Sequence, residues 1–160
     1  YQRALDLSSD NSDNNFELLL NIADMHNALG EWSSAITGYE CLLQSLKDDD
    51  SIRAVLLHNL GKIQSQLGNY SNAESNLQES LRLKRHVRSA PSELAKTLNA
   101  LGTVQAIQNE KALALQNFQE ALLLSRTSSS DDDSNEDLLL TLRNISVLKG
   151  SKVPKWNDET

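Results

Sequence analysis

The sequence has few cysteines, prolines and aromatic residues and no long apolar run, and each shortage excludes a class of protein. Cys41 is the single cysteine, so the chain cannot form an internal disulfide. The 2 prolines and 4% aromatic residues, beside 39% hydrophobic residues overall, favour helices packed through aliphatic and small side chains over a β-sandwich. No apolar stretch approaches the roughly 20 residues that a membrane-spanning helix needs. The composition therefore predicts a soluble, cytoplasmic, all-α protein.

Basic residues are also in deficit. The chain has 15 Lys and Arg against 22 Asp and Glu, which gives a formal net charge of −7 at pH 7. An acidic surface repels phosphate backbones, so nucleic acid is not an expected partner. The first residues, YQRALDLSSD, carry no apolar signal-peptide core, and no membrane partner is expected.

Catalytic and metal-binding motifs are missing too. His26, His58 and His86 lie far apart, and no second ligand stands at helical spacing from any of them. No glycine-rich phosphate loop is present. The acidic runs at 10–15 and 131–137 lack the central glycine that a calcium-binding EF-hand loop requires. We therefore expect no catalysis, no metal ion and no cofactor in this chain.

What the chain does contain is a helical pattern that occurs three times. Each copy has a small residue, an alanine twelve positions later, and a larger residue four positions after the alanine. Two antiparallel helices approach closely only where side chains are small, so we predict that the small residue faces the alanine across a helical hairpin. The copies are Ala23, Ala35 and Tyr39; Gly61, Ala73 and Leu77; and Gly102, Ala114 and Phe118.

The spacing of the copies predicts the boundaries of the hairpins. A fourth copy begins with Leu142, Ile145 and Ser146, and the opening YQRALDL matches the second-helix segments YECLLQS and FQEALLL. We therefore expect a fragment of a longer array, with half a unit at each end. The predicted repeat array spans 1–150 and is followed by a tail at 151–160. Within it, 1–7 ends a preceding second helix, 16–46, 52–88 and 92–125 are full hairpins, and 136–149 is the first helix of a fourth.

Turn and cap residues support these hairpins. Gly30 and Gly68 follow the first helices at the tight turns, where a residue often needs a positive φ. Asn109 takes this place in the third copy, because Asn tolerates the same conformation. Ser51 is a predicted start signal for the first helix of the second copy.

The pattern is similar to the tetratricopeptide repeat, W-x₂-L-G-x₂-Y followed by A-x₃-F and A. The resemblance runs from Tyr1 to about Gly150, with Leu in place of the first Trp, and with His26, Gln64 or Gln105 in place of the first Tyr. The usual closing Pro is absent. The long repeat and the phrase SELAKTLNALG resemble the repeats of kinesin light chains. The resemblance implies a right-handed α-solenoid of stacked antiparallel helical hairpins that acts as a protein-interaction scaffold.

The resemblance also implies that the first helices of the hairpins line a concave groove, where one row of residues stands out. The residue two positions before the small one is Asn21, Asn59 or Asn144 in three of the four copies, although Asn is a mediocre helix former. A side-chain amide can pair with the backbone of an extended peptide whatever its sequence. Two explanations stay open: the row binds a peptide, or its amides face solvent or bond to the next helix.

Neighbouring rows would select among ligands by side chain. Four of the predicted groove residues are basic centres, so the expected partner is a protein or an extended peptide of weakly acidic or mixed charge. Chaperone-binding members of the family hold a C-terminal carboxylate in a clamp, but Leu20 and Asp24 stand where clamp residues would be needed, and that activity is not expected. The predicted groove residues are Asn21, Asp24, His58, Asn59, Lys62, Lys96, Asn99, Thr103, Arg143 and Asn144.

Two other functions are compatible with the sequence. The repeats can act as a spacer or support for domains outside the fragment. They can also self-associate, because the half units leave apolar faces, such as 138–140 and Leu142, that something must cover.

Overall fold

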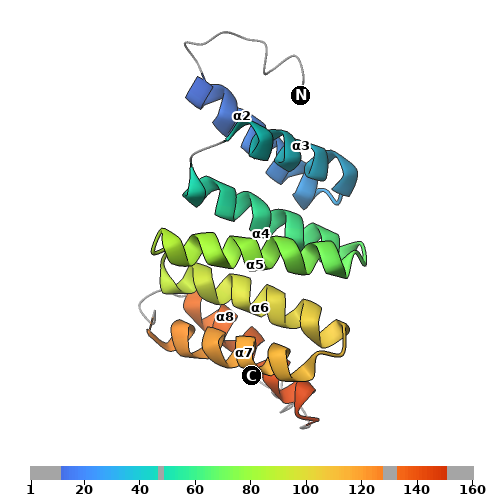
Figure 1. The fold of residues 1–160 in the computed structure, drawn as a ribbon, viewed down its shortest axis with the longest axis vertical. Helices are drawn as coiled ribbons and strands as arrows, with labels where there is room; N and C mark the ends of the chain where they lie inside the picture. Colours follow the sequence, from blue (N-terminus) through green and yellow to red (C-terminus); the bar gives the residue numbers. More distant parts are fainter. Residues whose placement is uncertain (1–11, 47–48, 128–132, 151–160) are drawn as a thin grey trace, which may run out of the picture. The chain divides into compact units, whose positions relative to one another are not determined.

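A computed structural model of the protein describes residues 12–46, 49–127 and 133–150, and this part of the chain is entirely helical (Figure 1). The all-α prediction is therefore confirmed. The predicted helix end at 1–7 and the tail at 151–160 lie outside the described residues. The helices are α2 (Ser12–Ala28), α3 (Trp32–Ser45), α4 (Asp50–Gln66), α5 (Tyr70–His86), α6 (Pro91–Ile107), α7 (Lys111–Thr127) and α8 (Asp133–Leu148).

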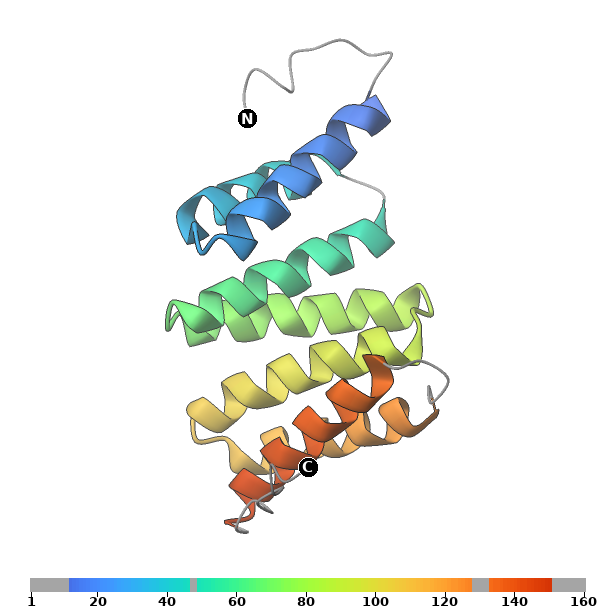
Figure 2. The ribbon, with the colours of Figure 1, turned by 180° about the vertical axis from the view of Figure 1, so that it is seen from behind.

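The chain divides into two compact units, and the division falls within α5, between Leu83 and Lys84. In unit 1, α2 packs on α3 and α3 packs on α4. In unit 2, α6 packs on α7, and α8 contacts both of them (Figure 2). Three-residue turns join α2 to α3, α4 to α5 and α6 to α7, so each pair is a helical hairpin.

The three turns are closed in the same way. Gly30, Gly68 and Asn109 have φ angles of 75°, 79° and 67°, which confirms the prediction of a positive φ at these positions. The next residue then donates its N–H to a carbonyl five residues earlier, as Glu31 does to His26 at 2.8 Å. This arrangement satisfies carbonyl groups that the end of the helix would leave unpaired.

The start of α4 differs from the prediction. Asp49 caps this helix, and its Oδ1 accepts hydrogen bonds from the backbone N–H groups of Ser51 and Ile52, both at 3.0 Å. The prediction that Ser51 starts the helix was therefore wrong, since Ser51 lies inside the first turn. A carboxylate is the stronger cap because it also complements the positive end of the helix dipole.

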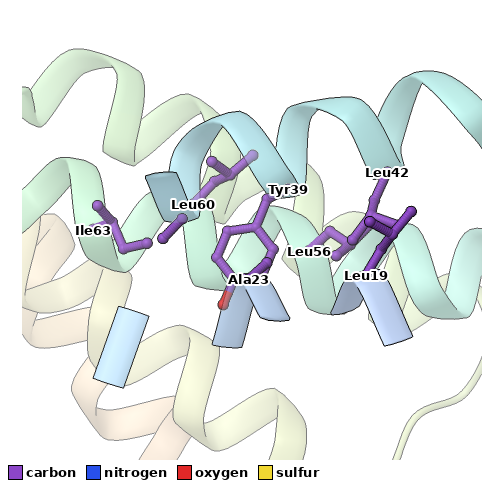
Figure 3. Packing of buried hydrophobic residues seen from close by; sticks show 8 residues of the cluster. Leu19, Ala23, Tyr39, Leu42, Leu56, Leu60 and Ile63 are labelled. Carbon is purple, nitrogen blue, oxygen red and sulfur yellow. The ribbon is translucent and has the colours of Figure 1, made fainter. Parts of the chain in front are cut away.

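The core of unit 1 is built where α2, α3 and α4 meet. Tyr39 of α3 is fully buried, and Figure 3 shows its ring beside Ala23 of α2, with Leu60 and Leu56 of α4 on either side. Aliphatic side chains from all three helices complete the cluster. Its other buried members are Leu19, Ala35, Leu42 and Ile63.

The glycine of the second and third copies makes room for the larger residue rather than mainly for the alanine. A Cβ atom on Gly61 would lie 2.6 Å from Cγ of Leu77 and 3.1 Å from the carbonyl oxygen of Ala73. A Cβ atom on Gly102 would lie 2.8 Å from Cε1 of Phe118. The predicted close packing at the glycine is confirmed, but its main partner is the larger residue. Ala73 supplies only one of the three nearest atoms at Gly61, and Phe118 supplies all three at Gly102.

A buried ion pair links the end of α5 to the start of α6 in unit 2. Lys84 is 2% exposed, and its Nζ donates to the backbone oxygen and to Oε2 of Glu93, at 3.2 and 3.1 Å. Burial lowers the pKa of Lys84. Burial by itself would raise the pKa of Glu93, but the ammonium groups of Lys84 and Lys96 lower it below its usual value. The ion pair offsets part of the cost of removing the Lys84 charge from water.

Gly61→Ala is expected to destabilise the protein by about 1–2 kcal/mol. Alanine raises helix propensity by about 1 kcal/mol, but its methyl group overlaps Leu77 in a packed interface and forces the two helices to shift. Urea denaturation followed by circular dichroism measures the difference. Lys62→Ala, at the next and exposed position of α4, is the matched control and should stay within about 0.5 kcal/mol of the wild type. A stabilised Gly61→Ala protein would show that the close approach is not needed.

Candidate binding surface

The predicted groove residues of unit 1 lie on α2 and α4, away from the packed faces of these helices. Asn21, Asp24 and Lys62 are exposed, and His58 and Asn59 are partly buried. Residues on the opposite sides of the same helices, such as Ala23 and Leu60, belong to the core. We call this set of five polar residues the unit 1 surface.

The predicted residues of unit 2 lie on α6 and α8. Lys96, Thr103 and Arg143 are exposed and Asn144 is partly buried; we call these four residues the unit 2 surface. Lys96 takes part in an ion pair, with its Nζ 3.3 Å from Oε1 of Glu93. The surface therefore combines two cations with a hydroxyl and an amide group.

Asn99 has a different role from the one that the sequence suggested. It is 4% exposed, and its Nδ2 lies 2.7 Å from Oγ1 of Thr141, which is also buried. The amide oxygen of Asn99 lies 3.0 Å from the same hydroxyl. These hydrogen bonds hold α6 against α8 and occupy the amide group, so we leave Asn99 out of the unit 2 surface.

A hydrogen-bonded cluster links all three helices at the centre of the unit 1 surface. The hydroxyl of Tyr39 donates to Oδ1 of Asp24. Nδ2 of Asn59 lies 3.3 Å from the same oxygen and 3.4 Å from the hydroxyl oxygen of Tyr39. Asn59 therefore bonds to other helices, as the second explanation for the Asn row suggested, but its partners lie on the preceding helices α2 and α3 rather than on the next one.

The environment of Tyr39 extends the neutral form of its hydroxyl to a higher pH than in an exposed tyrosine. Burial raises the pKa of its hydroxyl well above the ordinary value, and the hydrogen bond and negative charge of Asp24 raise it further. Tyr39 is thus a hydrogen-bond donor at neutral pH, and it fixes the position of the exposed Asp24 carboxylate.

Two amide pairs inside the hairpins were not predicted from the sequence. Nδ2 of Asn76 lies 2.7 Å from Oε1 of Gln64, and Nδ2 of Asn117 lies 2.6 Å from Oε1 of Gln105. Each Gln stands where the repeat consensus has its first Tyr, and its Asn partner follows twelve residues later. This is the spacing between the small residue and the alanine, so the pairs could have been found from the sequence.

The described ranges hold no group of three or more His, Cys, Asp or Glu side chains that could bind a metal ion. In the same part of the chain, no helix is long and apolar enough to cross a membrane.

A sequence profile described as Tetratricopeptide repeat matches residues 14–86 and 52–127. Together the two matches cover more than half of the 160 residues, so the chain belongs to the tetratricopeptide repeat family. The resemblance noted from the sequence is thereby confirmed. Tetratricopeptide repeats are protein-interaction modules.

Solved structures share this fold. BtubC (BKLC) from P. vanneervenii superposes with a TM-score of 0.80 at 22% identity over 93% of this chain, which spans 61% of the length of that BtubC chain. The N-terminal domain of stress-induced protein-1 (STI-1) from C. elegans has a TM-score of 0.65 at 14% identity, covering 89% of this chain and 99% of that one. These likenesses confirm the predicted fold class, an α-solenoid of the tetratricopeptide repeat type.

A third similar structure contains a ligand. The first TPR of Spaghetti (RPAP3), solved bound to the HSP90 peptide SRMEEVD, has a TM-score of 0.62 at 18% identity, covering 85% of this chain and 94% of that one. The sequence has no significant match among curated proteins.

Tyr39→Phe tests the cluster of Asp24, Tyr39 and Asn59. Loss of the hydroxyl should lower the free energy of unfolding by about 1–2 kcal/mol at pH 7. An unfolded tyrosine ionises at about pH 10, while buried Tyr39 keeps its proton because its pKa is raised. The free energy of unfolding of the wild type should therefore fall above that pH by about 1.4 kcal/mol per pH unit. Unfolding free energies measured between pH 9 and about pH 11 should show this loss in the wild type and in Tyr70→Phe. The same loss in Tyr39→Phe would contradict the assignment of this pH dependence to Tyr39.

Proposed function

We propose that the protein binds an extended peptide segment of another protein through the polar surface of one of its units, on α2 and α4 in unit 1 or on α6 and α8 in unit 2. The observation that carries this proposal is the arrangement of these helices. One side of each hairpin's first helix is packed against neighbouring helices, while the side that carries the unit 1 or unit 2 surface is exposed. Membership of a family of interaction modules supports binding rather than catalysis.

Each of the two surfaces, taken by itself, supplies the two kinds of contact that a peptide needs. The amide groups of Asn21 and Asn144 can hydrogen-bond to a peptide backbone, because each amide has both donors and an acceptor. Charged groups such as Lys62 and Arg143 can select among peptide side chains, since both are exposed. An acidic or mixed peptide fits the cations of the unit 2 surface.

Selection of a displayed library of random peptides against the purified protein tests this proposal. Affinities of the selected peptides are then measured by fluorescence anisotropy for two double variants, Asn21→Ala with Lys62→Ala in unit 1, and Lys96→Ala with Thr103→Ala in unit 2. At least one variant should weaken binding about tenfold, because each removes two polar contacts.

Ser75→Ala on α5 and Gln119→Ala on α7 are the matched controls, since both residues are exposed on second helices. These controls should leave the affinities unchanged. Equal losses in variants and controls, or none in either, would place the binding site elsewhere. Failure to select any peptide would refute peptide binding and leave the spacer function.

A second function, self-association, is favoured by the exposed leucines of α8. Leu139, Leu140 and Leu142 are 55%, 47% and 40% exposed, whereas Leu98, which corresponds to Leu142 in the repeat, is fully buried. The side chain of Leu138, part of the same sequence prediction, lies outside the described residues. If a second copy of the chain covers this face, light scattering should show a dimer that Leu142→Ser converts to a monomer. A monomer at every wild-type concentration would overturn this alternative.

A further inference from the structure

The Asp24 carboxylate is exposed and yet held in one orientation. Tyr39, which is fully buried, and Asn59, on a different helix, both donate hydrogen bonds to it. A side chain that is already ordered loses little conformational entropy when a ligand binds to it. Asp24 is therefore better prepared for binding than an ordinary surface carboxylate.

The negative charge of Asp24 has no cationic partner within the described part of the chain. Both hydrogen bonds go to Oδ1, and no described Lys, Arg or His side chain lies within ion-pair distance of the carboxylate. Lys62, the exposed cation of the same surface, is not paired with it. A carboxylate has about four acceptor sites, so Oδ2 can accept hydrogen bonds from a ligand.

Asp24 is also distinctive among the residues at its position in the repeat. The residue after the small one is Lys62 in α4, Thr103 in α6 and Val147 in α8, and all are exposed. Only α2 places a carboxylate there. The net charge of −7 adds a long-range attraction for cations, whereas a ligand carboxylate would meet like charge at Asp24.

We propose that Asp24 binds a lysine or arginine side chain of the peptide ligand. This inference rests on the proposed function, and it adds the chemistry of one ligand residue at the unit 1 surface. The cationic group sits on Oδ2 of Asp24, while Tyr39 and Asn59 act as positioning residues through Oδ1. Unit 1 therefore selects a basic residue, although the basic centres by themselves had suggested an acidic ligand.

A double-mutant cycle on peptides selected from a random library tests the inference. Selected peptides should be enriched in Lys or Arg at one position. Replacing that residue by norleucine should weaken binding to the wild type about three- to tenfold, the range for a partly exposed charged hydrogen bond. Asp24→Asn, which keeps an acceptor for Tyr39, should weaken the binding of the unmodified peptide by the same factor. The two changes together should weaken binding no more than either change alone.

Glu40→Gln is the matched control, because Glu40 is an exposed acid on α3 and the variant changes the net charge by the same amount. It should bind like the wild type. A measurement that needs no protein variant supplements the cycle. Added salt should weaken the binding of the basic peptide more than the binding of its norleucine form.

The possible failures are distinguishable. Selected peptides without a preferred basic residue, or equal affinities for wild type and Asp24→Asn, would overturn the role of Asp24 and leave peptide binding intact. Failure of the library to yield any peptide would overturn the proposed function and this inference together.

Discussion

The structure depends on the close approach of two helices at one small residue in each hairpin. Gly61 and Gly102 leave room for Leu77 and Phe118 directly against the backbone of the first helix, and Ala23 lies beside Tyr39 in the core of unit 1 (Figure 3). A larger residue would force the helices apart and lose dispersion contacts along their length. The contact also sets the rotation of each first helix, because it buries one side and leaves the polar side exposed.

Tyr39 joins this packing to the chemistry of the surface. Its ring fills the same place as Leu77 and Phe118, but its hydroxyl reaches the edge of the core and holds Asp24 together with Asn59. The hydroxyl is buried and would be costly to leave without a partner. One aromatic residue therefore stabilises the core and also orients a charged group that is exposed to solvent.

Equivalent positions in the repeat do not have equivalent roles. Asn21 is exposed, while Asn59 bonds to Asp24 and Tyr39, although both stand two residues before the small one. Asn99, which stands three residues before the small one in its copy, is buried against Thr141 and serves the packing of α6 on α8. A polar side chain that finds a partner on a neighbouring helix is used inside the protein, and only the remaining ones are available to a ligand.

The sequence by itself determined the fold class, the close contacts at Gly61 and Gly102 and the positive φ of Asn109, because these follow from spacing and from the size of single residues. The cap of α4 was predicted two residues too late, at Ser51, because Ser and Asp can both cap a helix and only the structure shows that Asp49 accepts the backbone hydrogen bonds. Tertiary structure alone decided that Asn99 is buried and that Asp24 is held by Tyr39. These features depend on which side chains from different helices meet, and the repeat spacing does not specify the lateral register of one helix against the next.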